Sequence, residues 1–532
     1  MGHQAAADLG LRDRYEARPT GLSEAALFHA LADAAEHAGE RPFAILDGGC
    51  LKYRELLEKA NDAAEALSAI GVRKGDLVAV LTENGFGFFV LYFALAKLGA
   101  VLVPMHSTYD SGATHKITAS AGIGLLLVSK QWAERHSEAV SVLEVSARVL
   151  LIDSGADPLA GAAAAKDRAS EFGPMSRARG DVFALAFTSG STGSPKGVVH
   201  TQHNVILNGY GVIEALGLGP EDRFLFNFPV STLMGLGWTA IVVLVEGSLV
   251  LMRQPTPEHA LHLIQEHGVT VHNGSVDMFL AEVACASAKS YDLASLRTGI
   301  VGGQVVDASF LKAVRGGLGL NLSYCYGMTE MAGAVTLVSP DADEETRHAR
   351  AGKPLRGAEI RIVDDAGRDV ERGQPGEVLC RAPFMALGYW VDGEVTPLTD
   401  AAGWFATGDV GRVDEQSHLR VLGRKGDRVS IDGRVVLIPE IELTLMKLDG
   451  VRRCIALAHN GALHVVVACE EDSAPGDGEL TGKIVEQTGL RPESCTLHVV
   501  DALPLTASGK PDRVAVAQWI VGHLERVSRV GI

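Results

Sequence analysis

The chain has 532 residues, of which 47% are hydrophobic and 21% are charged, a balance that excludes a disordered protein. Its formal net charge of −17, without any run of Lys or Arg, argues against a nucleic-acid-binding surface. The length allows about three to five folding units with at least one cleft between them. The 60 glycines and the low aromatic content of 6% favour an α/β enzyme over an all-β module.

The cysteines and the N-terminus indicate the compartment. The 7 cysteines are scattered and never spaced C-x-x-C, which argues against a disulfide framework and a zinc knuckle. Residues 1–18 contain charged side chains and no apolar core, so we expect no secretory signal and a cytoplasmic location. The strongest candidate for a membrane span, residues 86–105, is interrupted by Lys97, Gly99 and Pro104. We interpret it as a buried helix followed by a buried strand.

Two successive regions alternate between helical periodicity and short apolar strands. In the first, from residue 22 to about residue 170, we expect a helix at 88–98 and strands at 77–81, 100–103 and 124–128. The second begins with a strand at 182–187, and there we expect a helix at 257–268 and strands at 222–228, 240–245, 248–252, 269–272 and 296–301. This alternation predicts mostly parallel sheets covered by helices on both faces.

The pattern changes after about residue 352. Short strands at 359–363, 376–381, 410–413 and 419–422 are separated by Gly, Asp and Pro turns, which predicts a small β-barrel or sandwich. The charged stretch at 423–427 then precedes a region that mixes helices and strands. We therefore expect an N-terminal domain over residues 1–424 and a C-terminal domain over residues 425–532.

The most informative segment, residues 188–197, reads T-S-G-S-T-G-S-P-K-G and directly follows the apolar strand at 182–187. Glycines let the backbone approach a ligand, hydroxyls add donors and Lys196 supplies a positive charge, so the segment is suited to hold phosphate. It is not a Walker A loop, because Pro195 precedes the lysine and no Ser or Thr follows it. The segment also lacks the G-x-S-x-G pattern of a hydrolase nucleophile elbow.

Further motifs follow in order along the chain. Residues 326–330 read Y-G-M-T-E, 376–390 begin with G-E and end with G-Y-W, 403–409 read G-W-F-A-T-G-D, 424–442 begin with Arg424 and end with P-E-I-E, and 504–510 read P-L-T-A-S-G-K. With the segment at 188–197, these motifs resemble the adenylate-forming superfamily of acyl-CoA synthetases, carrier-protein-loading adenylation domains and luciferases. The resemblance implies an α/β fold, in which a large N-terminal domain of two αβ layered subdomains plus a small β-barrel is joined to a mobile, small α+β C-terminal domain.

The resemblance also implies a nucleotide site built from several motifs. Tyr326 would pack on the adenine ring, Thr329 would contact the α-phosphate, and Glu330 would hold Mg²⁺, which prefers oxygen ligands. Asp409 would accept hydrogen bonds from the ribose hydroxyls, with Arg424 as a second ribose or phosphate contact. The remaining residues that the resemblance assigns to ATP or AMP are Thr188, Ser189, Ser191, Thr192 and Lys196 around the β- and γ-phosphates, the pair Gly302 and Gly303, and Gly327.

The resemblance implies that Lys510 is the most important catalytic residue of the first step. In the first step a carboxylate attacks the α-phosphorus of ATP as pyrophosphate departs, and a cation that reaches both groups stabilises the developing charge. The family's C-terminal domain, which bears this lysine, rotates after adenylation so that the CoA thiolate can attack the acyl-adenylate. The resemblance places Gly433 at the CoA site, while Pro439, Glu440 and Glu442 are expected to open a helix and to be structural. The implied catalytic set is Lys510, Lys196, Glu330 and Thr329.

The sequence departs from its relatives at three places, one of which is residues 274–277, G-S-V-D, where many relatives have a V-P-T-like run. The hinge position is often Asp or Lys in the family and is Gly426 here, which relaxes the backbone but offers no side chain to fix either orientation. In residues 229–235, Thr232 stands in place of the gating histidine, and no nearby acid is available to recognise an α-amino group. The lining expected for the acyl pocket is mostly apolar, namely Thr232, Leu233, Met234, Leu236, Trp238, Val301, Cys325 and Met328.

The leading hypothesis is an ATP-dependent acid:CoA ligase that converts a predominantly apolar or aryl carboxylic acid to acyl-AMP and then to acyl-CoA, using ATP, Mg²⁺ and coenzyme A. Two alternatives stay open, an enzyme specialised for thioester formation from supplied acyl-AMP and a ligase that loads a carrier protein. A nucleotide-binding regulator is disfavoured because Lys196, Glu330, Asp409 and Lys510 are all present, and luciferase chemistry ranks last. We expect no nucleic-acid partner and no membrane span, and leave a homodimer and a role in secondary metabolism open.

Overall fold

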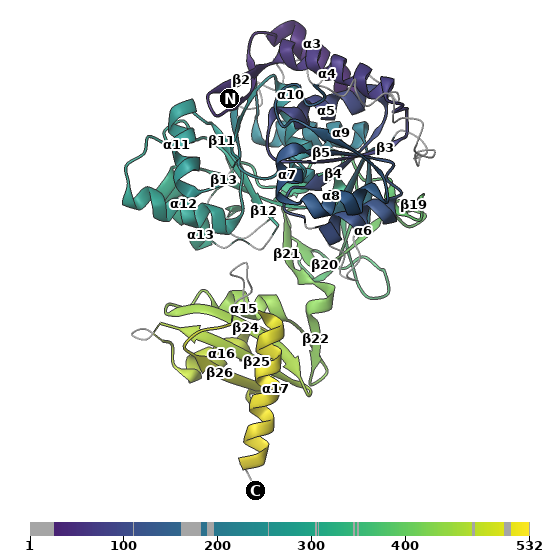
Figure 1. The fold of residues 1–532 in the computed structure, drawn as a ribbon. Coiled ribbons are helices and arrows are strands. Elements are labelled where there is room, and N and C mark those ends of the chain that lie inside the picture. Colours follow the sequence, from purple (N-terminus) through teal and green to yellow (C-terminus); the bar gives the residue numbers. More distant parts are fainter. Residues whose placement is uncertain are drawn as a thin grey trace. The chain divides into compact units, whose positions relative to one another are not determined.

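The computed structural model describes residues 26–109, 111–160, 182–188, 196–253, 255–303, 306, 308–343, 346–347, 351–470, 474–504 and 512–530 (Figure 1). The chain divides into two compact units. Unit 1 comprises Met1–Ile360, Cys380–Phe405 and Ser417–Leu419, and unit 2 comprises Arg361–Leu379, Ala406–Gln416 and Arg420–Ile532. The expected boundary between residues 424 and 425 stays a prediction. No helix in the described ranges is long and apolar enough to cross a membrane.

The largest sheet has eight strands, in the order β19 (Glu394–Pro397), β18 (Gly388–Val391), β8 (Lys196–Thr201), β7 (Val182–Thr188), β4 (Val101–His106), β3 (Leu77–Thr82), β5 (Leu125–Ser129) and β6 (Arg148–Ile152). Strands β3 to β7 pair in parallel, whereas β8, β18 and β19 are added antiparallel at one edge. The parallel sheet expected from the first region is therefore confirmed. Its strands read as unbroken apolar runs because both faces are buried.

Two further sheets complete unit 1. The five-stranded sheet has the order β11 (Val271–His272), β9 (Arg223–Phe226), β10 (Ser248–Leu251), β1 (Pro42–Leu46) and β2 (Gly49–Lys52), and the four-stranded sheet has the order β12 (Gly299–Gly302), β13 (Leu322–Met328), β14 (Gly333–Leu337) and β15 (Lys353–Pro354). The helices of this unit are α3 (Ala26–Ala38), α4 (Tyr53–Ala69), α5 (Phe86–Leu98), α6 (Ser111–Ala121), α7 (Lys130–Arg135), α8 (Ser137–Glu144), α9 (Gln202–Leu216), α10 (Leu233–Val245), α11 (Pro257–His267), α12 (Val276–Ala288), α13 (Ala308–Leu318) and the short 3₁₀ helix η2 (Thr329–Met331).

One expected strand is wrong. Residues 240–245 form the second half of helix α10, which the Thr232 side chain caps at its start and Glu246 ends in the left-handed conformation at φ 57°. Nearly every residue of this helix beyond its first turn is buried, so its sequence shows neither a polar face nor the alternation of a half-buried strand. A short apolar run of this kind has no periodicity that separates a buried helix from a buried strand.

Helix α5 lies between the five-stranded and eight-stranded sheets and is buried on all sides. Its Phe89 contacts Phe43 of β1 with ring centroids 5.2 Å apart, and its Tyr92 contacts Phe183 of β7 at 5.1 Å. Both pairs have the edge-to-face geometry that aromatic rings prefer. The apolar stretch at 86–105 is thus a core helix followed by the buried strand β4, as expected.

The strands predicted after residue 352 are present and form a four-stranded sheet. Its order is β16 (Glu359–Val363), β17 (Gly376–Arg381), β20 (Phe405–Val413) and β21 (Leu419–Arg424). Strand β20 begins five residues before its predicted start at residue 410, so it includes most of the G-W-F-A-T-G-D motif. For this region the sequence predicted a small β-barrel or sandwich, and the structure contains this four-stranded sheet.

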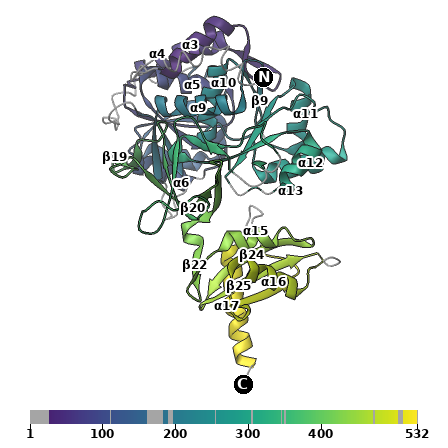
Figure 2. The ribbon, with the colours of Figure 1, turned by 180° about the vertical axis from the view of Figure 1, so that it is seen from behind.

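The C-terminal part of unit 2 mixes helices and strands as expected. A three-stranded sheet, β24 (Val451–His459), β25 (Ala462–Cys469) and β26 (Cys495–Val500), follows the hairpin of β22 (Arg428–Ile431) and β23 (Arg434–Leu437). One face of β25, including Val465, packs against Ile441 and Leu480, and the other, including Val466, packs against Ile520. Figures 1 and 2 show the ribbons of these elements from opposite sides. The helices on these faces are α15 (Ile438–Leu445) and α16 (Asp477–Thr488) on the first and α17 (Arg513–Val530) on the second, and the short 3₁₀ helices are η3 (Lys425–Asp427) and η4 (Pro492–Ser494).

Candidate active site

The strands on both sides of the expected phosphate loop pair with each other. Strand β7 ends at Thr188, β8 begins at Lys196, and these two residues are partners in the antiparallel register. The pairing brings the two ends of the loop side by side. The residues of the expected site that lie outside the described part of the chain are Ser189, Ser191, Thr192 and Lys510, together with the side chain of Thr188.

Lys196, Tyr389 and Glu330 meet in unit 1 although they come from three separate motifs. Tyr389 lies on β18 and is paired with Val198 of β8. Its hydroxyl donates a hydrogen bond to Glu330 Oε1 at 2.7 Å, and Lys196 Nζ lies 5.4 Å from the centre of its ring. Tyr389 therefore contacts both the lysine expected at the ATP phosphates and the carboxylate expected at Mg²⁺. Sequence analysis noted the G-Y-W motif but missed this role of its tyrosine.

The chemistry around Glu330 fits a Mg²⁺ ion held mainly by substrate. Within the described ranges, only the Tyr389 hydroxyl hydrogen-bonds the Glu330 carboxylate, and no group of three or more His, Cys, Asp or Glu side chains could hold a metal ion. Mg²⁺ is commonly bound by one or two carboxylates together with substrate phosphates. Burial, reinforced by the bond to Glu330, raises the pKa of Tyr389, so the phenol remains a hydrogen-bond donor at neutral pH.

Two glycines allow close backbone packing at the carboxyl ends of β12 and β13. These strands are parallel neighbours, with Gly302 paired to Cys325. A Cβ on Gly302 would lie 2.6 Å from Cys325 Sγ, and a Cβ on Gly327 would lie 2.2 Å from the Gly333 carbonyl oxygen. A larger residue at 327 therefore cannot fit without moving the backbone, and one at 302 would displace the Cys325 side chain. Tyr326 is 9% exposed beside these glycines, and its contact with adenine stays a prediction.

Asp409 and Arg424 lie on neighbouring strands of the four-stranded sheet, β20 and β21. Arg424 Nε is 3.1 Å from Asp409 Oδ1, and Arg424 Nη1 donates to the Thr407 carbonyl at 3.4 Å. The Asp409 side chain is 7% exposed, whereas that of Arg424 is 67% exposed. The structure thus brings together the two residues that the resemblance assigns to the ribose. Their contact with a nucleotide stays a prediction.

Among the residues expected in the acyl pocket, Thr232 caps a helix. Thr232 Oγ1 accepts a hydrogen bond from the Gly235 amide at 3.1 Å and donates one to the Pro229 carbonyl at 2.8 Å, so this side chain caps the N-terminus of α10. Trp238 and Val301 are buried. The acyl pocket itself stays a prediction. That Leu233, Met234 and Met328 line it also stays a prediction.

The expected hinge and CoA residues differ in how strongly the backbone requires glycine. Gly426 lies in η3 without a positive φ, and no atom outside this local stretch of chain lies within 4 Å of the position that a Cβ would take. This conformation therefore accepts other residues at 426. Gly433, in contrast, forms the two-residue turn between β22 and β23 with Asp432, at φ 73° and 51°, a conformation that favours Asp-Gly. Both functional assignments stay predictions.

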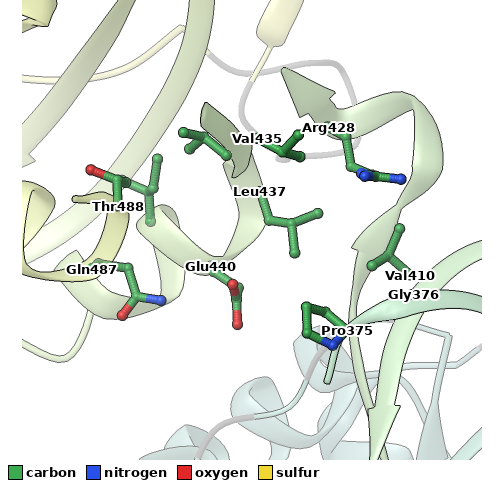
Figure 3. Close-up of a pocket in the computed structure, with 11 residues that line it drawn as sticks. Pro375, Gly376, Val410, Arg428, Val435, Leu437, Glu440, Gln487 and Thr488 are labelled. Carbon is green, nitrogen blue, oxygen red and sulfur yellow. The ribbon is translucent and has the colours of Figure 1, made fainter. Parts of the chain in front are cut away.

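A cavity of about 220 Å³ lies within unit 2 (Figure 3). Arg428 at its wall is paired with Asp365 at 3.0 Å, and most of the other lining side chains are apolar or uncharged. None of its residues is assigned to ATP, the acid or CoA, so this cavity is not the expected active site. It is lined by Pro375, Gly376, Val410, Arg428, Val435, Val436, Leu437, Glu440, Ile441, Gln487 and Thr488.

His200 is a buried residue near the site that sequence analysis missed. It lies on β8 opposite Ala184, is 0% exposed, and neither ring nitrogen makes a hydrogen bond that meets normal geometry within the described part of the chain. Burial lowers the pKa of His200 from 6.5 to about 4, although the nearby Thr329 backbone partly opposes this shift. The imidazole is therefore neutral at neutral pH.

We expect His200 to make the fold less stable in acid. Because its pKa is lower in the folded chain, the unfolded chain binds the proton first as pH falls from 6.5 towards about 4, so stability decreases across this window. The loss reaches about 2.5 kcal/mol near pH 4.5. Urea unfolding of His200→Leu should show a weaker pH dependence than wild type. An exposed histidine on α11, replaced in His262→Gln, is the control, and an equal pH dependence in all three proteins would contradict the prediction.

The chain matches the family model described as AMP-binding enzyme over residues 31–390. It is 30% identical over 477 residues to a feruloyl-CoA synthase from Amycolatopsis sp., covering 88% of this chain and 94% of the relative. It is 28% identical over 409 residues to a 2-succinylbenzoate–CoA ligase from Geobacillus sp., covering 77% and 79% of the two chains. O-succinylbenzoate coenzyme A synthetase (MenE) from Bacillus subtilis, solved with ATP and magnesium ion, has a similar fold, with a TM-score of 0.72, 24% identity and coverage of 91% of this chain and 98% of that chain.

The fold and the arrangement of the motifs thus define an adenylate-forming enzyme. This chain belongs to the AMP-binding enzyme family. The expected fold class is confirmed, and so is the expected activity class, an AMP-forming acid–thiol ligase of the acyl-CoA synthetase type. The roles of individual residues stay predictions.

Proposed function

We propose that this enzyme activates a predominantly apolar or aryl carboxylic acid and transfers the acyl group to CoA. The contacts of Tyr389 carry the proposal, because they join a cation suited to phosphate with a carboxylate suited to Mg²⁺. The names of the feruloyl-CoA synthase and the 2-succinylbenzoate–CoA ligase support an acid that contains an aryl group. No disulfide joins any of the seven cysteines, all of which lie in the described ranges, and this supports a cytoplasmic setting.

In the adenylation step, the residues of the site bind ATP and stabilise charge. Lys196 supplies a positive charge to the β- and γ-phosphates, Thr329 contacts the α-phosphate, and Glu330 is the carboxylate that would hold Mg²⁺, which neutralises phosphate charge when bound. The acid's carboxylate oxygen bonds to the α-phosphorus while the bond to pyrophosphate breaks. Lys510 stabilises the negative charge on both reacting groups, and Asp409 holds the ribose.

In the second step, the CoA thiolate attacks the acyl carbonyl of acyl-AMP and AMP departs. Gly433 lies at a tight turn and itself has no side chain to limit the approach of a ligand to its backbone, which supports its assignment to the CoA site. Gly426 would serve as the pivot between the two steps. Open space around its Cβ position means that substitutions there test the pivot without creating a clash in the present conformation.

The direct test is a screen of aryl and aliphatic acids with the purified enzyme, ATP, Mg²⁺ and CoA, using mass spectrometry to quantify acyl-AMP and acyl-CoA separately. We expect acyl-AMP and pyrophosphate without CoA, and acyl-CoA with CoA. Acyl-AMP that never becomes acyl-CoA would favour a carrier-protein acceptor. Acyl-CoA formed only from supplied acyl-AMP would favour the specialised thioester-forming enzyme. No product from any acid would contradict the proposal.

We expect Tyr389→Phe to weaken the enzyme's use of Mg²⁺ while keeping its ring near Lys196. The change removes the 2.7 Å hydrogen bond that orients Glu330, and a hydrogen bond to a charged group is worth about 1.5–3 kcal/mol. The Mg²⁺ concentration that gives half-maximal acyl-AMP formation should therefore rise by about tenfold. Tyr389→Leu, which also removes the ring, should cost more. An unchanged Mg²⁺ titration in Tyr389→Phe would show that this bond does not position Glu330.

A further inference from the structure

The buried Glu442 carboxylate forms an ion pair with Arg513, whose side chain is 44% exposed, in unit 2. Arg513 Nη2 lies 2.8 Å from Glu442 Oε1 and 2.6 Å from Oε2, so one guanidinium nitrogen contacts both carboxylate oxygens. Glu442 is 9% exposed. Burial raises the pKa of the Glu442 carboxyl, and Arg513 together with the Ala456 amide counteracts that shift. The sequence predicted only that Glu442 helps to open a helix.

The pair also binds the main chain of a third element. The Ala456 amide donates to Glu442 Oε1 at 2.8 Å, and Arg513 Nη1 donates to the Ala456 carbonyl at 3.3 Å. Ala456 lies on β24, at the edge of the three-stranded sheet, so the two side chains satisfy both main-chain groups of one edge residue. Helix α15, strand β24 and the first residue of α17 are thereby joined.

Arg513 stands three residues after Lys510 in the sequence. The two flanks of the segment at 505–511, which contains Lys510, are hydrogen-bonded to each other. The Asp512 amide donates to the Pro504 carbonyl at 2.8 Å, and the Asp512 side chain accepts from the amides of Val514 and Ala515 at 3.0 Å each, which caps α17. Arg513 then fixes the first turn of that helix through Glu442.

We propose that Glu442 is a positioning residue for adenylation, acting through Arg513 to fix the flank of the segment that contains Lys510. This inference rests on the proposed role of Lys510. An electrostatic contact made in the transition state depends steeply on geometry, so a small displacement of the attachment reduces the rate without removing any group that touches substrate. Thioester formation does not use Lys510 and is therefore insensitive to the pair.

The test measures each half-reaction in Glu442→Gln, a change that keeps the side-chain volume but turns an amide group towards the guanidinium. With the most active acid of the screen, kcat for acyl-AMP formation should fall by about tenfold, while KM for ATP and the rate of acyl-CoA formation from supplied acyl-AMP stay within about twofold. Arg513→Lys, which keeps the charge, should be milder than Arg513→Gln. Hydrogen exchange at the Ala456 amide should increase, which reports the broken contact independently of activity.

Two comparisons make the result decisive. In a Lys510→Ala background, Glu442→Gln should cause no further loss of adenylation, because the pair acts through a lysine that is already absent. Glu486→Gln, which breaks an exposed ion pair with Lys483 on α16, should change neither half-reaction. Parallel loss of both half-reactions, additive loss in the double variant, or no loss in Glu442→Gln would overturn the inference. If Lys510→Ala itself left adenylation intact, the proposed role of Lys510 would be wrong, and the inference with it.

Discussion

Replacing Lys510 with alanine should slow acyl-AMP formation by about 10²-fold or more while leaving acyl-CoA formation from supplied acyl-AMP largely intact. Transition-state charge contacts typically cost this much when they are lost. The split is expected because the lysine stabilises charge on the α-phosphate and the attacking carboxylate, groups that react only in the first step. Pyrophosphate release and thioester formation, measured separately in single-turnover experiments, check both parts.

Two further variants define what Lys510 contributes. Lys510→Arg keeps the charge but replaces a compact ammonium with a planar group, so it should recover only part of the rate. Lys483→Ala removes an exposed lysine of the same unit and should leave both half-reactions unchanged. Equal loss of both half-reactions in Lys510→Ala would show that the lysine is not specific to adenylation.

Replacing Asp409 with alanine should weaken the binding of ATP and of acyl-AMP together, because the ribose is common to both ligands. The lost charge-assisted hydrogen bonds are worth about 1.5–3 kcal/mol, or about a tenfold to hundredfold loss of affinity. Arg424, left without its partner, remains 67% exposed and so stays solvated, which limits the cost to folding. Calorimetric titration with ATP and with a non-hydrolysable acyl-AMP analogue gives both affinities directly.

The matched control for Asp409→Ala is an aspartate that is paired with an arginine of the same sheet. Asp369 forms an exposed ion pair with Arg361 of β16, with Nε and Oδ1 2.7 Å apart, and no role in nucleotide binding is assigned to it. Asp369→Ala should therefore leave both affinities unchanged. Unchanged affinities in Asp409→Ala, or equal losses in the two variants, would rule out the ribose contact.

Features that depend on neighbouring residues were predictable from the sequence. The strands at 77–81 and 124–128 are continuous apolar runs, which only a sheet buried on both faces can accommodate, and the structure contains them as β3 and β5. The segment at 188–197 combines glycine, hydroxyl and lysine chemistry within one loop length. Adenylate-forming enzymes bind ATP through short motifs of this kind. The class of enzyme could therefore be inferred from the sequence before the fold was known.

The tertiary structure decided what depends on distant residues. The hydrogen bond from Tyr389 to Glu330 spans 59 residues of sequence, and the pair of Arg513 with Glu442 spans 71, so no local pattern reveals either contact. The complete burial of the His200 imidazole depends on the packing around β8. Residues 240–245 are helical because they belong to α10, which is buried on nearly all sides. Short-range propensity is the same whether or not such contacts form. Only the folded chain determines which side chains lose water and which polar groups remain to bind one another.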